Sequence, residues 1–200
     1  PDWECVQDIL DHGARERIDL IEVGSHVFAT VAGVGFGARL TQNFNELRER
    51  SGFFRAASRL CSSQIYSLLS LKEIAMGATI GEYIRVDCEA FSETVRAAAI
   101  MICNQDRLGG DICVAPPQDQ TDARFNVLII PADSVPWMRV GLVGTLASLK
   151  LGHIPQGAIS FSTDELSLSV SRGISLPLFA DGEVISRESR YRFRVLRSAL

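Results

Sequence analysis

Cysteine and basic residues are too few or too scattered in this sequence for a zinc protein, a disulfide-stabilised protein or a nucleic-acid-binding protein. The five cysteines form an odd set without any Cys-x-x-Cys spacing, which argues against a zinc site and against a disulfide framework. The formal net charge is −4, whereas a nucleic-acid-binding protein would need a basic surface, so we expect no nucleic acid as a partner. Polar residues interrupt every apolar stretch, and no signal peptide is recognisable, so we expect a cytoplasmic protein without a membrane span.

The sequence also lacks the motifs of the commonest catalytic and nucleotide-binding sites. The three histidines, His12, His26 and His153, lie far apart, and none is near a Gly-x-Ser-x-Gly nucleophile pattern. The glycine-rich run AGVGFGA at 32–38 lacks the Gly-x-Gly-x-x-Gly spacing and the βαβ continuation of a dinucleotide site. We therefore favour close backbone packing at a strand-to-helix turn for this run.

What the sequence does contain is the pattern of a globular α+β protein. Of the 200 residues, 46% are hydrophobic, which is enough to bury a substantial core. Helical periodicity marks residues 2–12, 37–76 with a break at 50–52, and about 134–150. Strand-like runs lie at 17–24, 26–35, 83–104 as a hairpin of two strands, 111–116, 124–131, 157–162, 165–171, 176–185 and 189–196. This arrangement predicts an antiparallel β-sandwich with an inserted helical segment at about 37–76.

Acidic and amide side chains gather between two of these strands, in NQDRLGGDICVAPPQDQTDARFNV at 104–127. Loops on a rigid sheet often carry function, and oxygen-rich loops suit a hard cation such as Mg²⁺. The pattern alone favours a pair of solvated turns, and a cation-binding loop stays open as the alternative. The polar residues concerned are Asn104, Asp106, Asp111, Asp119 and Asp122.

Another carboxylate stands out in LFADGEVI at 178–185. Asp-Gly between two extended runs is a strong hairpin signal, so the local pattern favours a turn residue for Asp181. A carboxylate held at the end of a strand can also accept a proton in catalysis. The catalytic role therefore stays open as the alternative to a simple turn residue.

Three segments carry a resemblance to a known family. They are RIDLIEVGSHVFATVAGVGFGA at 17–38, CNQDRLGGDICVAPPQDQTDARFNV at 103–127 and LPLFADGE at 176–183. Their order and spacing resemble the C-terminal domain of the bacterial-type diacylglycerol kinase and lipid kinase family, relatives of the sphingosine and ceramide kinases. In that family the matching positions hold a glycine-rich turn, an Asn followed by Gly-Gly-Gly and Ala-Pro, an Asp-Gly motif and a late Asp-Gly-Glu.

The resemblance implies that residues 1–200 form the substrate-side β-sandwich domain of a two-domain, ATP-dependent lipid kinase. The N-terminal nucleotide-binding domain, with its Gly-Gly-Asp-Gly-Thr loop, is then absent from this chain, and the fragment alone is expected to be inactive. The implied substrate is a hydroxyl of a diacylglycerol-like or sphingoid lipid, taken from a membrane surface at which the protein is peripheral. The exposed edges of a sandwich also make a homodimer an open alternative to a monomer.

The resemblance also implies roles for individual residues. Asp181 falls on the family's proposed general base. A loop Mg²⁺ site would be carried over onto Asp119, Asp122 and Arg124, the outer two through main-chain oxygen. Part of the helical insertion would face the lipid, with core packing as the alternative; the apolar residues concerned are Phe53, Phe54, Leu60, Ile65, Tyr66 and Leu69.

Three positions depart from the family pattern, and they leave a second function open. Gly37 stands where the family commonly has Asp, Asp111 replaces a third glycine, and Ala123 replaces the glycine after Asp122. A lipid-binding or scaffolding module that has lost kinase activity is therefore the alternative to an active kinase domain.

Overall fold

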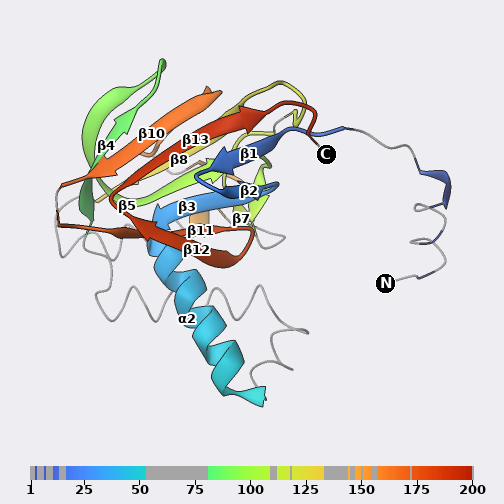
Figure 1. The fold of residues 1–200 in the computed structure, drawn as a ribbon, viewed down its shortest axis with the longest axis horizontal. Coiled ribbons are helices and arrows are strands. Elements are labelled where there is room, and N and C mark those ends of the chain that lie inside the picture. Colours follow the sequence, from blue (N-terminus) through green and yellow to red (C-terminus); the bar gives the residue numbers. More distant parts are fainter. Residues whose placement is uncertain are drawn as a thin grey trace.

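Nearly all the described elements of the computed structural model are strands of one antiparallel sheet (Figure 1). The structure describes residues 3, 7, 11–13, 17–52, 81–108, 112–117, 119–132, 144, 147–149, 151–154, 157–171 and 173–199. The strands are β1 (Leu20–Val23), β2 (His26–Phe28), β3 (Val31–Gly35), β4 (Glu82–Asp87), β5 (Ser92–Cys103), β6 (Arg107–Leu108), β7 (Ile112–Cys113), β8 (Phe125–Pro131), β9 (Ile159–Thr163), β10 (Glu165–Val170), β11 (Leu176–Ala180), β12 (Glu183–Glu188) and β13 (Arg190–Leu196). One helix, α2 (Phe36–Arg50), is described in full.

The long strand β5 divides the sheet into two layers. Its first half pairs with β4, and beyond β4 follow β10, β13, β1 and β2. Its second half pairs with β3 on one side and with β8 on the other, so that β12, β11, β3, β5, β8 and β9 form the other layer. The small pair β6–β7 stands apart from this sheet. The predicted antiparallel β-sandwich of α+β class is confirmed.

The layer of β4, β10 and β13 follows the alternating sequence pattern of a sheet with one wet face. In β13, Tyr191 and Phe193 are buried while Arg192 and Arg194 between and after them are exposed. The buried side chains of both layers meet in one core whose largest fully buried members include Phe125, Phe193 and Ile100. Burying each such side chain contributes about 1.5–3 kcal/mol, so this core is the main source of stability.

The inner strands of the other layer, β3, β11 and β8, are mostly buried, which explains why they do not alternate. All five residues of β11 are buried, as expected for a strand with neighbours above and below. On the outer face, Phe179 and Met101 pack with Ala38 of α2 and with Leu149. Figure 1 shows α2 projecting from this side of the sandwich.

The glycine-rich run is a point of close packing, in agreement with the sequence analysis. Gly35 has a φ of 84°, and a Cβ placed there would lie 2.4 Å from the main-chain oxygen of Ala98. A Cβ at Gly37 would lie 2.9 Å from the ring of Phe179. Only glycine allows β3 to run into α2 at this distance from β5 and β11.

The predicted strand at 26–35 is wrong in one respect, because it consists of two strands. β2 ends at Phe28 and β3 begins at Val31, with Ala29 and Thr30 between them. The main-chain N–H groups of Ala29 and Thr30 bond to a side chain from another hairpin, so they are not used in a sheet ladder. Similarly, of the described residues of the predicted strand at 111–116, only Ile112 and Cys113 form a strand, and no local pattern predicted their partner β6.

Several sequence predictions fall outside the described residues. The second part of the helical segment at 37–76, with its apolar residues from Phe53 to Leu69, lies there, as does Asp111. Most residues of the helices predicted at 2–12 and 134–150 do as well. Within the part of the chain that the structure describes, no helix is long and apolar enough to cross a membrane.

Candidate active site

Asp181 lies in a two-residue turn between β11 and β12, as the sequence pattern predicted. Asp181 and Gly182 have φ angles of 46° and 86°, and two positive φ angles are what a type I′ hairpin turn requires. The main-chain N–H of Asp181 donates to the carbonyl of Val31 at 3.1 Å, which ties the turn to the start of β3. Aspartate tolerates a positive φ better than most residues, so the turn needs no second glycine.

The carboxylate of Asp181 is held by three hydrogen bonds from the break between β2 and β3. Its Oδ2 accepts the N–H of Ala29 at 3.0 Å, and its Oδ1 accepts the N–H of Thr30 at 2.9 Å and the hydroxyl of Thr30 at 2.5 Å. A carboxylate offers about four acceptor positions. The described contacts therefore fix its orientation and leave a position on Oδ2, at an exposed site, for the hydroxyl of a ligand.

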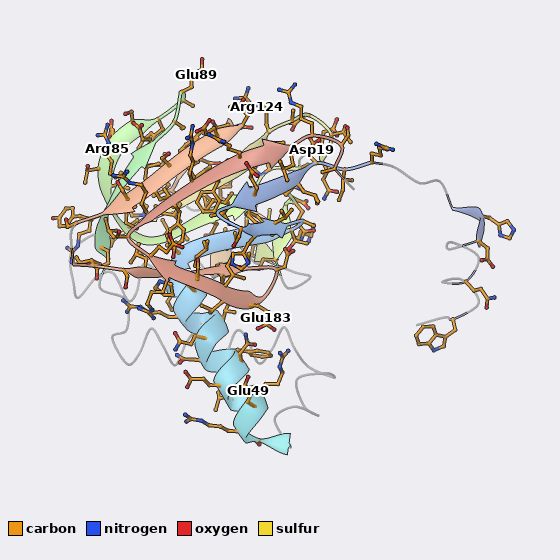
Figure 2. All side chains as sticks on the ribbon, viewed as in Figure 1. Asp19, Glu49, Arg85, Glu89, Arg124 and Glu183 are labelled. Atoms are coloured by element: carbon orange, nitrogen blue, oxygen red, sulfur yellow. The ribbon has the colours of Figure 1, made fainter. Side chains whose placement is uncertain are left out.

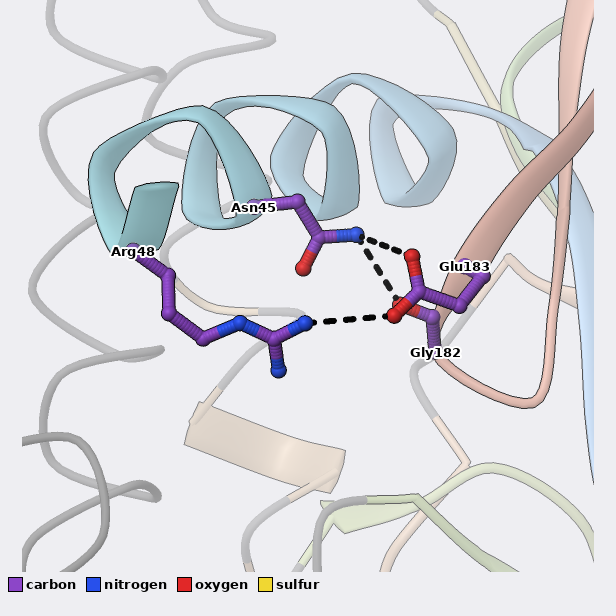
Figure 3. Close-up of polar contacts among 4 residues, drawn as sticks. All are labelled: Asn45, Arg48, Gly182 and Glu183. Carbon is purple, nitrogen blue, oxygen red and sulfur yellow. Dashed lines mark hydrogen bonds and ion pairs between the residues drawn. The ribbon is translucent and has the colours of Figure 1, made fainter. Parts of the chain in front are cut away.

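Glu183, the last residue of the Asp-Gly-Glu triplet, faces helix α2 (Figure 3). Its carboxylate accepts hydrogen bonds from Asn45 Nδ2 at 3.0 Å and from Arg48 Nη2 at 3.3 Å. Asn45 Nδ2 also donates to the carbonyl of Gly182 at 3.3 Å. The donors of all three contacts lie on α2, and the acceptors are the two residues that follow Asp181. These bonds hold α2 directly beside the turn.

Asn104, which follows the last residue of β5, binds the two residues between β2 and β3 through hydrogen bonds to their carbonyls. Its main-chain N–H donates to the carbonyl of Thr30 at 2.8 Å, and its Nδ2 donates to the carbonyls of Ala29 at 3.0 Å and Asp19 at 2.8 Å. The side chain is fully buried. Its Oδ1 is a buried oxygen without a hydrogen-bond partner among the described residues.

The loop of the predicted metal ligands lies before β8 and is closed by its own hydrogen bonds. Asp119 Oδ1 accepts the N–H and the hydroxyl of Thr121, and these bonds lower the pKa of Asp119. Asp122 Oδ1 accepts the N–H of Arg124 at 2.9 Å. The guanidinium of Arg124 donates to Ser162 at 2.8 and 3.2 Å.

This loop is anchored by Asp19, which no sequence motif marked as a site residue. Its buried carboxylate accepts the N–H of Ala123 and the N–H of Ser198, both at 2.7 Å. Ala123 has a φ of 60°, the conformation that the family's glycine would adopt without strain. Asp19 and Arg124 lie at the upper end of the sandwich, whereas Glu183 lies beside α2 (Figure 2).

The predicted site residues thus form two groups rather than one. Asp181 is held by the break between β2 and β3, while Asp119, Asp122 and Arg124 share the loop before β8. Bonds from Asn104 to Ala29 and to Asp19 run between the groups. Among the described residues there is no cluster of three or more His, Cys, Asp or Glu side chains arranged for a metal ion, but a ligand set with two main-chain oxygens would not form such a cluster.

Together, the fold and the site define a two-layer β-sandwich domain with a hydrogen-bonded carboxylate on a hairpin turn. The model of the YegS C-terminal NAD kinase beta sandwich-like domain matches residues 30–200, and the chain belongs to this family. The resemblance to the C-terminal domain of bacterial lipid kinases is thereby confirmed.

Solved structures share the fold at low sequence identity. A crystal structure of a diacylglycerol kinase from Bacillus anthracis strain Sterne superimposes with a TM-score of 0.62 at 12% identity. Two structures of a candidate diacylglycerol kinase from the same strain give TM-scores of 0.61 at 11% identity. In all three the match covers 92% of this chain and 55% of the other, so this chain spans little more than half their length. No curated protein matches the chain.

Proposed function

We propose that this chain is the substrate-side domain of an ATP-dependent lipid kinase and that Asp181 is its general base. The observation that carries the proposal is the carboxylate of Asp181, which three hydrogen bonds orient at an exposed turn with an acceptor position left on Oδ2. The proposed substrate is the hydroxyl of a diacylglycerol-like or sphingoid lipid. Membership of the YegS C-terminal family supports this substrate class.

The proposed reaction needs little covalent participation by the protein. Asp181 Oδ2 accepts the proton of the lipid hydroxyl as its oxygen bonds to the γ-phosphorus of ATP. The bond from that phosphorus to the β–γ bridging oxygen breaks, and ADP leaves. ATP would be bound mainly by an N-terminal domain of the full-length protein.

A Mg²⁺ ion is a second part of the proposal. The carboxylate of Asp122 and the main-chain oxygens of Asp119 and Arg124 would hold it, and an all-oxygen ligand set fits this hard cation. When bound there, the ion would supply positive charge that holds the acidic loop before β8 together.

Replacement of Asp181 by Asn in the full-length protein tests the proposal. Asn keeps the shape of the side chain and tolerates a positive φ, so the fold should be retained. Because its amide nitrogen cannot accept an N–H, the melting temperature should fall moderately, and activity is compared at a temperature well below it. Transfer of phosphate from labelled ATP to diacylglycerol or sphingosine in mixed micelles should fall by about 100-fold or more, the usual contribution of a general base.

Asp87→Asn is the matched control, because Asp87 is an exposed carboxylate on β4 that also accepts a serine hydroxyl. It should transfer phosphate at the normal rate. An Asp181→Asn protein with normal activity would show that Asp181 is not the base. A wild-type protein that binds the lipid but never phosphorylates it would favour the non-catalytic module instead.

A further inference from the structure

Ala29 and Thr30, the two residues between β2 and β3, are hydrogen-bonded to Asp181 on one side and to Asn104 on the other. Their N–H groups and the hydroxyl of Thr30 donate to Asp181. Their carbonyls accept from Asn104, Ala29 through Nδ2 and Thr30 through the main-chain N–H. Every main-chain polar group of this dipeptide is therefore committed either to the carboxylate or to Asn104.

Asn104 is suited to this task because it offers two side-chain donors from a fixed, buried position. It directly follows Cys103, the last residue of β5, and is 0% exposed. One N–H of Nδ2 donates to the carbonyl of Ala29, and the other donates to the carbonyl of Asp19. Aspartate at this position would lack both donors, so the amide is specifically required.

Thr30 adds a contact that the backbone cannot supply. Its hydroxyl lies 2.5 Å from Oδ1 of Asp181, within the range of charge-assisted O–H···O⁻ bonds. Since Oδ1 also accepts the N–H of Thr30, both of its acceptor positions are occupied. The oxygen left with a position for a substrate proton is Oδ2.

We propose that Thr30 and Asn104 are positioning residues for the catalytic carboxylate of Asp181. Thr30 selects which carboxylate oxygen faces the substrate, and Asn104 holds the Ala29–Thr30 backbone that presents the donors. The inference rests on the proposed role of Asp181 as general base. A base misplaced by a fraction of an ångström loses rate without losing substrate affinity.

Thr30→Val tests the role of Thr30, because it removes the hydroxyl and keeps the shape and the main-chain N–H. In the full-length protein, kcat should fall about 10-fold while KM for ATP and for lipid stays unchanged, which corresponds to one hydrogen bond to a charged group. Thr30→Ser, which keeps the hydroxyl, should restore kcat to within about twofold of wild type.

The matched control is Ser92→Ala, which removes another hydroxyl that donates to an aspartate at 2.5 Å, here Asp87 on the other layer. Its kcat and KM should equal those of the wild type. A fall in kcat of the same size in Ser92→Ala and Thr30→Val would mean that the loss at Thr30 is not specific, and it would overturn the proposal.

Asn104 is tested in two backgrounds, because the single variant loses stability as well. Asn104→Ala should lower kcat in the wild-type background and should lower it no further when Asp181 is already Asn. Equal losses in both backgrounds would show that Asn104 does not act through Asp181. Where Asn104→Ala does not fold, the Thr30→Val, Thr30→Ser and Ser92→Ala set decides the proposal.

Failure of this inference can be told apart from failure of the proposed function. If Asp181→Asn has normal activity, the proposed function is wrong and the positioning role falls with it. If Asp181→Asn is inactive but Thr30→Val keeps the kcat of the wild type, only the positioning role is wrong.

Discussion

Asp19 shows how much of this site depends on single polar residues inside the sandwich. It is 2% exposed and accepts main-chain N–H groups from the loop before β8 and from the C-terminal segment. Its own carbonyl accepts from Asn104. Two segments that are distant in sequence therefore meet at the carboxylate of Asp19, and a third bonds to its main-chain oxygen.

Replacing Asp19 by Ala should destabilise the protein by about 3 kcal/mol, because two N–H groups lose a charged acceptor and one of them is partly buried. Urea unfolding followed by circular dichroism measures this free energy. Asp87→Ala, which removes an exposed carboxylate on β4, should cost less than about 1 kcal/mol. Equal losses in the two variants would contradict the anchoring role of Asp19.

Ala123→Gly should stabilise the protein by about 0.5–1 kcal/mol. The left-handed conformation costs a residue with a side chain about 1–2 kcal/mol, and the greater freedom of glycine in the unfolded chain offsets about half of that. Ala158→Gly, at a residue without a positive φ, should instead destabilise. Urea midpoints of both variants measure the difference, and a loss of stability in Ala123→Gly would show that the turn is not strained.

At the scale of elements, local sequence patterns predicted the strands and turns whose structure depends on neighbouring residues. The strands β10 and β13, the hairpin of β4 and β5 and the Asp-Gly turn before β12 were all predicted. The break at Ala29–Thr30 was not, because its donors are satisfied by a carboxylate more than 150 residues away in sequence, and no local pattern records such a partner. Thr30 and Asp19 were missed as site residues for the same reason.

Helix α2 shows a compensating pair of residues across two elements. Gly37 departs from the Asp that the family resemblance implied for this position, and the ring of Phe179 on β11 occupies the space beside it. Phe179 is 1% exposed and packs in the cluster that includes Ala38. The departure at Gly37 is thus matched to a large side chain on the neighbouring strand.

Gly37→Ala should destabilise the protein by about 1–3 kcal/mol, although alanine is the better helix former, because the new Cβ would collide with a packed ring. Gly144→Ala, where the added Cβ meets no atom of the described residues within 4 Å, should be neutral or stabilising by up to about 1 kcal/mol. Thermal unfolding compares the two. Phe179→Leu should reduce the loss caused by Gly37→Ala; additive losses would exclude the collision.

At the scale of the whole molecule, Tyr191 joins the two layers of the sandwich. It lies on β13, and its hydroxyl donates to the carbonyl of Leu176 on β11 at 2.6 Å. The same oxygen accepts the N–H of Glu188 on β12 at 2.8 Å. Burial raises the pKa of Tyr191 above its ordinary value.

Stability should therefore fall as the pH rises above about 10, where an unfolded tyrosine ionises. The unfolded chain then binds fewer protons than the folded one, so the free energy of unfolding decreases with pH. Urea unfolding between pH 8 and 11 should show a shallower decrease in Tyr191→Phe than in the wild type. Tyr83→Phe, at an exposed tyrosine on β4, should keep the wild-type dependence, and identical slopes in all three proteins would contradict the prediction.

The break between β2 and β3 is also the place where the chain crosses from one layer to the other, since β2 ends one layer and β3 belongs to the other. Ala29 and Thr30, which donate hydrogen bonds to the carboxylate of Asp181, thus lie at this crossing between the layers, the seam of the sandwich. A peptide that contained only the β11–β12 hairpin would lose these donors and the bond from Asp181 to Val31. The geometry of Asp181 is therefore a property of the closed sandwich, and it should disappear as soon as the seam opens.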